Sequence, residues 1–146
     1  MRYFLDTEYN GFGGALLSLA LVPEDGSEEF YVTLQHEGPI DPWVERHVLP
    51  YLDMVPEALL SHRLPRHGAA EALAAWLAHD EAPDIVADWP EDLAQLAMLL
   101  VTGPGMMLTV PPLSLHLISL HGFSTAANSA VPHNALHDAR ALRDHI

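Results

Sequence analysis

Cysteine and lysine are both absent from the sequence, and its only fixed side-chain cations are six arginines. The absence of cysteine excludes disulfides, thiolate zinc sites and a cysteine nucleophile. No apolar run approaches the roughly 18 residues of a membrane-spanning helix, and the first residues, with Arg2 and Asp6, do not form a signal peptide. We therefore expect a soluble, cytoplasmic protein with no membrane partner.

The formal net charge is -14 at pH 7. A protein that holds a long nucleic acid by neutralising its phosphates is usually basic, so this charge excludes a broad electrostatic grip on such a partner. Two alternatives are left: the chain binds a short piece of nucleic acid through metal ions and a local basic patch, or it does not bind nucleic acid. Clustered carboxylates bind Mg²⁺ or Mn²⁺, which would make part of the acidic charge functional.

The length of 146 residues, of which 49% are hydrophobic, predicts one domain with a real core. The patterns predict strands at residues 2–7, 15–22, 29–34, 84–87 and 106–110. They predict helices that begin at Asp41-Pro42, cover 68–79 and about 88–100, and end the chain at about 135–145 behind an N-cap at Asn134. The segment 113–131 is open between helix and loop. This order indicates an α/β fold with a mixed sheet.

Asp6-Thr7-Glu8 ends the first expected strand. Residues two apart on a strand point to the same face, so two carboxylates project together from an apolar strand. Burying them side by side is costly unless a divalent cation lies between them. The alternative is that both are solvated at the strand end.

His133-Asn134-Ala135-Leu136-His137-Asp138-Ala139 marks the start of the last expected helix. A helix N-terminus favours an ionised Asp138, and a neutral imidazole at His133 is suited to taking a proton from water. The alternative is a helix cap flanked by surface histidines.

Asp88-Trp89-Pro90-Glu91-Asp92 lies where a buried strand is expected to end and a helix to begin. Sites in α/β sheets are commonly found at such a junction. Acidic residues are also frequent at helix starts because of the helix dipole alone.

Together these segments resemble the motifs of the DEDDh 3′→5′ exonucleases, which include ribonuclease T, oligoribonuclease and the proofreading subunit of bacterial replicative polymerase. The Asp-x-Glu of that family is matched by Asp6 and Glu8, and its His-x-Ala-x-x-Asp-Ala by the segment from His133 to Ala139. The short chain looks most like the small mycobacterial-type exoribonuclease branch.

The middle motif of the family is often Asn-x-x-x-Asp. Asp92 matches its Asp, whereas Asp88 stands where the Asn often occurs, so either residue is a candidate ligand. The spacing favours Asp92.

The resemblance implies one exonuclease domain over residues 1–146, with a ribonuclease H-like fold whose mixed five-stranded sheet is flanked by helices. It implies two Mg²⁺ or Mn²⁺ ions on Asp6, Glu8, Asp92 and Asp138, with His133 as the general base. The expected substrate is the 3′ end of single-stranded RNA, and the products are nucleoside 5′-monophosphates. A homodimer is also implied.

Residues beside the motifs are expected to contact the substrate: Thr7, Tyr9, Phe12, Asp88, Trp89 and Asn134. The glycine-rich loop carries Tyr9 and Phe12, one of which is expected to stack on the terminal base of the substrate. The alternative is that this loop is a plain turn and Phe12 folds into the core. Arg63 and Arg66 belong to the one cluster of basic residues away from the termini. Three roles are open for this cluster: it holds substrate, it forms part of a dimer interface, or it is a solvated loop.

Three other functions remain open. The first is an exonuclease of the same group that acts on DNA, because one sequence does not show the 2′-hydroxyl contact that separates RNA from DNA. The chain is a catalytically idle nucleic-acid or protein-binding module. Or it is a ribonuclease H-type endonuclease, which the histidine-containing motif disfavours.

Overall fold

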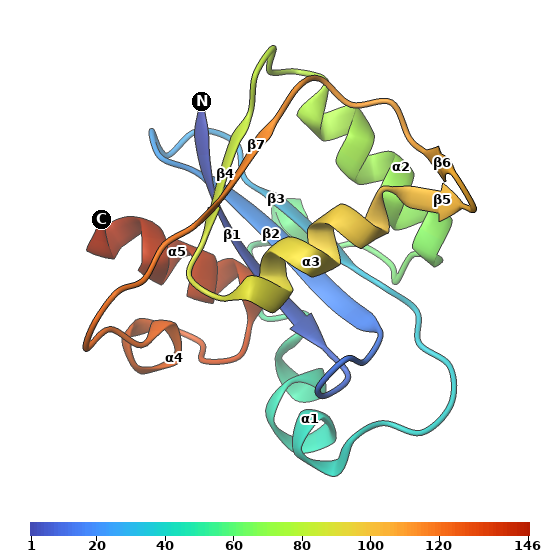
Figure 1. Cartoon of the computed structure of the whole chain (residues 1–146). Coiled ribbons are helices and arrows are strands. Elements are labelled where there is room, and N and C mark those ends of the chain that lie inside the picture. The colour runs from blue at the N-terminus through green and yellow to red at the C-terminus, as the bar shows by residue number, and fades with distance from the viewer.

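The computed structural model describes residues 1–146 and contains a mixed five-stranded sheet with helices on both faces (Figure 1). The strands of this sheet are β1 (Arg2–Tyr9), β2 (Leu16–Pro23), β3 (Phe30–Thr33), β4 (Asp84–Ala87) and β7 (Ser114–Leu117), while β5 (Val101–Gly103) and β6 (Met106–Met107) form a separate hairpin. The helices are α1 (Pro42–His47), α2 (Arg66–Leu77), α3 (Pro90–Leu99), α4 (Thr125–Asn128) and α5 (Ala135–His145), with 3₁₀ turns η1 (Leu49–Tyr51) and η2 (Glu57–Leu59). None of these helices has the length and apolar character that crossing a bilayer requires.

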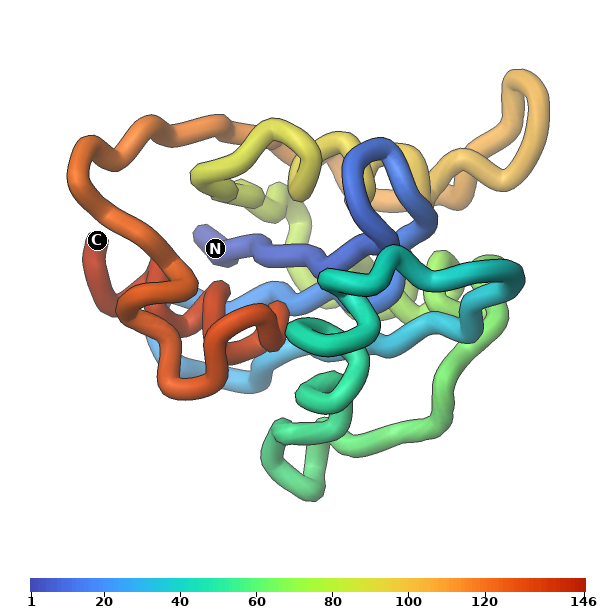
Figure 2. Tube along the Cα trace, turned by 90° about the horizontal axis from the view of Figure 1, so that it is seen from below, coloured from blue at the N-terminus to red at the C-terminus, as the bar shows by residue number.

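The sheet has the strand order β3-β2-β1-β4-β7. β1, β2 and β3 are antiparallel neighbours, whereas β4 and β7 run parallel to β1. Because β1 and β4 are parallel, their carboxyl ends meet at the same edge of the sheet. The view from below in Figure 2 shows that the starts of α3 and α5 and the whole of α1 gather around this edge.

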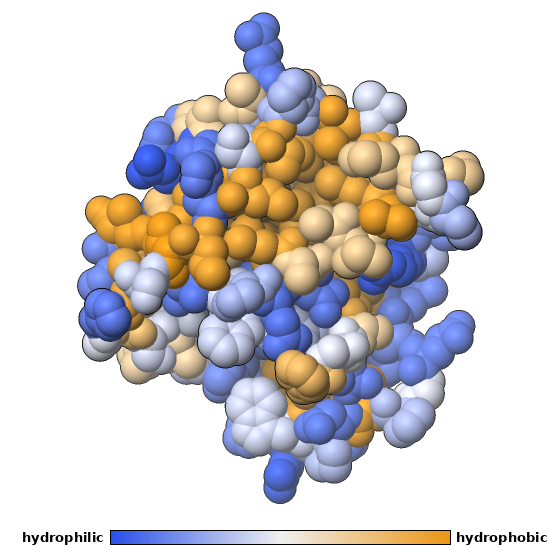
Figure 3. Space-filling view, viewed as in Figure 1, coloured by the Kyte–Doolittle hydropathy of each residue, from blue (hydrophilic) through white to orange (hydrophobic).

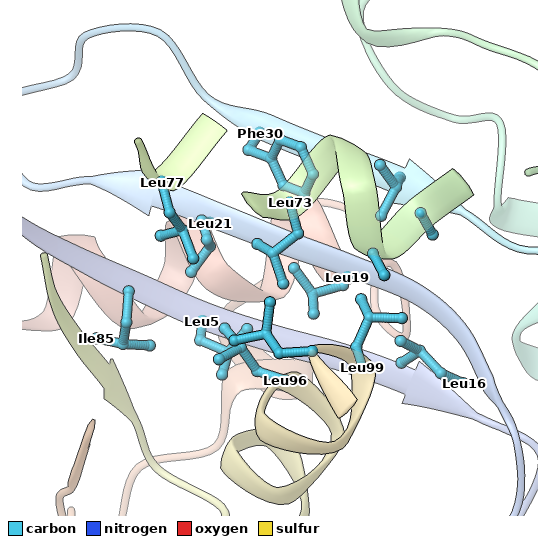
Figure 4. Close-up of a cluster of buried hydrophobic side chains, with 14 of the residues drawn as sticks. Leu5, Leu16, Leu19, Leu21, Phe30, Leu73, Leu77, Ile85, Leu96 and Leu99 are labelled. Carbon is cyan, nitrogen blue, oxygen red and sulfur yellow. The ribbon is translucent and has the colours of Figure 1, made fainter. Parts of the chain in front are cut away.

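The main core lies between the sheet and helices α2 and α3 (Figure 4). Leu5 and Leu21 from the sheet meet Leu73 of α2 and Leu96 of α3 there. The opposite face of the sheet is covered by α5, where Leu142 packs against residues of β1 and β4. β2 is buried along its whole length because helices cover both faces of the sheet at that position.

Most of the expected elements are confirmed, with ends displaced by a few residues. β4 has the expected bounds, and the helix expected from Asp41-Pro42 is α1. The Asp41 carboxylate accepts hydrogen bonds from the backbone amides of Trp43 and Val44, which makes it the N-cap. The side chain of Asn134 caps α5 in the same way.

The expectation of a fifth sheet strand at 106–110 is wrong. Only Met106 and Met107 are extended there, and they pair back on β5. The strand beside β4 is β7, which lies in the segment 113–131 that was open between helix and loop. All four β7 side chains are exposed, so no burial pattern in the sequence distinguishes this strand from a loop.

Truncating the core should cost far more stability than truncating the surface. Leu96 is fully buried between α3 and the sheet, so we expect Leu96→Ala to lower the free energy of unfolding by about 2–5 kcal/mol. Met54→Ala removes a half-exposed side chain and should stay within about 0.5 kcal/mol. Urea denaturation measures both, and equal effects would contradict this placement of the core.

Candidate active site

Asp6 and Glu8 lie near the carboxyl end of β1 and point to the same face of the sheet as Phe4, the face that α5 covers. Asp6 is only 8% exposed, and Glu8 is half-buried. The strand pattern therefore brings two carboxylates together in a poorly solvated position, as the sequence predicts.

Asp92 comes from the first turn of α3 and is 3% exposed. Its Oδ1 accepts a hydrogen bond from the Thr7 hydroxyl at 2.6 Å and another from the Thr7 backbone amide at 3.2 Å. The structure shows that this buried hydroxyl holds Asp92, while the expected contact of Thr7 with substrate stays a prediction. Asp88 is half-buried and lines the same pocket as Asp6 and Asp92.

Asp138 lies in the first turn of α5 and is 4% exposed. The preceding Asn134 is fully buried, with its Oδ1 on the amides of Leu136 and His137 and its Nδ2 donating to the Tyr51 carbonyl at 2.8 Å. The expected substrate contact of Asn134 stays a prediction, because these bonds engage its side chain in the helix cap and on Tyr51. Its cap fixes the start of the helix that carries Asp138.

His133 is the one residue other than glycine with a positive φ, at 65°. This backbone conformation is uncommon for a residue with a side chain and indicates a local constraint. The His133 imidazole lies near Glu8 and Asp138, with which it presents three potential ligand atoms within 4.8 Å of one another. An uncommon backbone conformation, an imidazole and two carboxylates thus lie close together.

The sequence did not reveal that α1 also borders the site. The Trp43 ring packs edge-on to His133 at 4.8 Å between centroids, and the His47 ring lies 6.4 Å from it. Burial, followed by the proximity of His47, lowers the pKa of His133 and favours the neutral form of its imidazole. Trp43 and His47 share a helix face by their spacing, but nothing in the sequence places that face beside His133.

The four carboxylates hold their protons more tightly than usual. Burial, then the charge of Asp92, raises the pKa of Asp6 well above its ordinary value. Burial, then the charge of Asp138, raises the pKa of Glu8 to about 9. Burial is also the first cause that raises the pKa of Asp92 to about 7 and that of Asp138 to about 6. These groups repel one another once ionised, so a cation between them would stabilise them.

Two buried oxygens of this cluster lack any hydrogen-bond partner, namely Oδ2 of Asp6 and Oδ1 of Asp138. Buried polar atoms are seldom left unpaired in proteins, and carboxylate oxygens are the ligands that Mg²⁺ and Mn²⁺ prefer. The residues therefore fit a divalent cation. Mg²⁺ and Mn²⁺ would prefer the carboxylate oxygens to the His133 imidazole.

Aromatic side chains surround the entrance to the site. Phe12 is 97% exposed, which excludes the alternative that it folds into the core. Trp89 is also exposed, and both line a pocket of about 480 Å³ together with Tyr9, Trp43 and Glu8. These rings form a rim directly beside the carboxylates.

The loop that presents Phe12 is fixed by close backbone contacts. A Cβ at Gly14 would lie 1.9 Å from the Asn10 carbonyl oxygen, so only glycine fits this position. The Gly14 carbonyl accepts a hydrogen bond from Gln95 of α3, and Asn10 bonds to the start of α1 through the Asp41 amide. The aromatic side chain is therefore exposed on an anchored loop.

Ion pairing separates the arginines into two groups. Arg2, Arg63, Arg140 and Arg143 each pair with carboxylates. Arg46 and Arg66 have no acidic partner within 4.0 Å. Arg66 lines a pocket of about 450 Å³ together with Phe12, next to the aromatic rim. Of the two arginines in the predicted basic cluster, Arg63 is therefore paired with an acidic side chain and Arg66 is not.

The raised pKa values predict how stability depends on pH. Between about pH 4, where the unfolded carboxyls ionise, and about pH 9, the folded protein binds more protons than the unfolded chain. The free energy of unfolding in EDTA should therefore fall as pH rises through this window. Thermal melts at pH 5 and pH 8 measure it, and a melting temperature that rises would contradict the clustering.

Asp6→Asn provides a sharper form of this test. It removes a buried ionisable group at the centre of the cluster, so this variant should be more stable than the wild type in EDTA at pH 8. Glu81→Gln, which neutralises an exposed carboxylate, should have no such effect. Added Mn²⁺ should stabilise the wild type more than Asp6→Asn.

No protein-family model matches the chain, and no curated protein resembles it closely enough to count as a relative. Its function therefore has to be argued from its own residues.

Proposed function

We propose that the chain is a metal-dependent 3′→5′ exoribonuclease of the DEDDh type with a ribonuclease H-like fold. The observation that carries the proposal is the convergence of Asp6, Glu8, Asp92 and Asp138 beside His133. These residues come from β1, α3 and the start of α5, and they are the ones that the resemblance assigns to catalysis. A mixed five-stranded sheet flanked by helices agrees with the fold that the resemblance implies.

Divalent cations on the four carboxylates would activate the attacking water and neutralise charge on the phosphate and on the leaving oxygen. The Thr7 hydroxyl keeps Asp92 directed into the site. Neutral His133 takes the proton from water, and burial next to Trp43 favours its uncharged form. Each residue therefore has a defined role in hydrolysis of a phosphodiester.

The surroundings of the site support a short single-stranded substrate. Exposed Phe12 and Trp89 offer faces on which unpaired bases can stack, and stacking tolerates any base. Arg66 offers one guanidinium to a backbone phosphate next to Phe12. With so few free cations, a long duplex would find little electrostatic attraction on this acidic chain.

The proposed activity is tested with single-stranded RNA and DNA labelled at either end, in Mg²⁺ or Mn²⁺ and in EDTA. We expect stepwise release of nucleoside 5′-monophosphates from the 3′ end of RNA, only with metal. Asp6→Ala and Asp138→Ala should abolish the activity, and His133→Ala should lower kcat by about 10²–10⁴-fold. Full activity of both aspartate variants, or internal cleavage, would contradict the proposal.

The aromatic rim should affect substrate binding more than chemistry. Phe12→Ala should raise KM roughly five- to hundredfold with little change in kcat, because stacking contributes about 1–3 kcal/mol per base. Arg66→Ala should also raise KM and weaken the salt dependence of binding. Leu60→Ala and Arg143→Ala are matched controls away from the rim, and an unchanged KM for Phe12→Ala would exclude stacking.

A further inference from the structure

A hollow of about 320 Å³ adjoins the carboxylates where α3 begins, and its lining includes Asp6, Asp88 and Asp92. We refer to it as the Asp88 hollow. Figure 3, in the same view as Figure 1, shows hydrophilic surface at the start of α3, below the broad hydrophobic area over β7 and α3. The unpaired Oδ2 of Asp6, an almost fully buried side chain, belongs to this lining. A buried acceptor without a partner indicates a ligand site.

The position of the Asp88 hollow suits the last nucleotide of a strand that lies across the carboxylates. The pocket of about 480 Å³ shares Phe12 and Glu91 with the pocket that contains Arg66, so the groove continues on that side. The Asp88 hollow shares no residue with the Arg66 pocket. The rest of the strand therefore has room to continue past Phe12, while its last base meets the ring of Trp89 in the Asp88 hollow.

The Asp88 carboxylate has no partner of its own within the chain. It is half-buried, no cationic group lies within 4.0 Å of it, and no donor of another residue forms a hydrogen bond with it. Burial is the first cause that raises the pKa of Asp6 and that of Asp92, and the charge of Asp88 contributes to both. Asp88 therefore faces the same space as the carboxylates that are proposed to hold metal.

The chemistry of a carboxylate restricts what the partner of Asp88 can be. An ionised carboxylate only accepts hydrogen bonds, and it repels a phosphate, so its partner must be a neutral donor. The last nucleotide of RNA has two such donors, the adjacent 2′- and 3′-hydroxyls of its ribose, and the sugar lies closer to the phosphate than the edge of the base does. An Asp or Glu binds a ribose hydroxyl in this way in dinucleotide-binding proteins.

We propose that Asp88 accepts hydrogen bonds from the 2′- and 3′-hydroxyls of the last ribose and thereby selects RNA over DNA. A terminal deoxyribose lacks the 2′-hydroxyl and leaves one of these bonds unmade. A site built to bind a hydroxyl rejects an analogue that lacks it, because the protein acceptor then stays unpaired in a poorly solvated position. The role of Asp88 rests on the proposed exonuclease activity and names the sugar for which that site is built.

Short RNAs that differ only in the sugar of the last nucleotide test this role directly. The three sugars are ribose, 2′-deoxyribose and 2′-fluoro-2′-deoxyribose, whose fluorine is small but cannot donate a hydrogen bond. For the wild type we expect kcat/KM to be about 10- to 100-fold higher with ribose than with the other two, as for a hydrogen bond to a charged group. In Asp88→Ala the preference should fall to within about threefold, because only the ribose substrate loses an interaction. A merely structural role of Asp88 would lower all three values equally.

Glu91→Ala is the matched control. Glu91 lies at the same helix start but lines the pocket that contains Phe12 and not the Asp88 hollow, so its removal should leave the preference for ribose at the wild-type value. Asp88→Asn keeps the shape of the side chain and should also reduce the preference, since an amide donor replaces one of the two acceptor oxygens. Circular dichroism shows whether each variant is folded.

Equilibrium binding provides a readout that does not depend on turnover. In Mn²⁺, the wild type should bind adenosine 5′-monophosphate about tenfold more tightly than 2′-deoxyadenosine 5′-monophosphate, because only the first offers both hydroxyls to Asp88. Asp88→Ala should bind the two nucleotides equally, and Glu91→Ala should distinguish them as the wild type does.

A wild type that cleaves RNA with no preference for the last sugar, or an Asp88→Ala variant that keeps the preference, would overturn the role of Asp88 and leave the exonuclease activity standing. So would a preference that follows the last base instead of its sugar. Mn²⁺ binding that Asp88→Asn weakens as much as Asp138→Asn does would also overturn it, because Asp88 would then be a metal ligand. A wild type that cleaves no nucleic acid contradicts the proposed function, and the role of Asp88 with it.

Discussion

The burial of several carboxylates beside one another is the constraint on which the rest of this structure depends. Asp6, Asp92 and Asp138 are almost completely buried, and the charges of Asp92 and Asp138 add to the effect of burial in raising the pKa of Asp6. The apolar core and the hydrogen bonds from Thr7 must offset the free energy that this arrangement costs. Packing of α3 and α5 on opposite faces of the sheet therefore stabilises a site that is unfavourable by itself, as is common where function sets the arrangement.

Much of the fold could be predicted because its elements carry periodic apolar patterns or recognisable caps. Asp41-Pro42 and Asn134 mark helix starts by their own chemistry, and β4 is a short apolar run between turn residues. β7 could not be predicted, because its side chains face solvent and its position results only from pairing with β4. A strand defined by its backbone partner leaves no pattern in its own sequence.

The carboxylates and His133 of the candidate site could be predicted because each motif has a local signature. Asp6 and Glu8 are two residues apart on a strand and so share a face, whereas Asp92 and Asp138 lie at helix starts. The sequence could not show that the Thr7 hydroxyl holds Asp92 or that Asn134 also bonds to Tyr51, because these partners lie far away in the chain. Trp43 and His47 were missed because their approach to His133 depends on how α1 packs at the end of the sheet. Such long-range proximity follows from tertiary structure, and nothing local in the sequence marks it.

Calorimetric titration of the metal-free protein with Mn²⁺, in two buffers of different ionisation enthalpy, tests the central claim most directly. Glu8, with a pKa of about 9, and Asp92, with a pKa of about 7, hold protons near neutral pH that a bound cation must displace. The account predicts saturable binding with release of protons at pH 7, and much weaker binding to Asp138→Asn. Absence of binding, or equal binding by Asp138→Asn, would contradict a shared metal site.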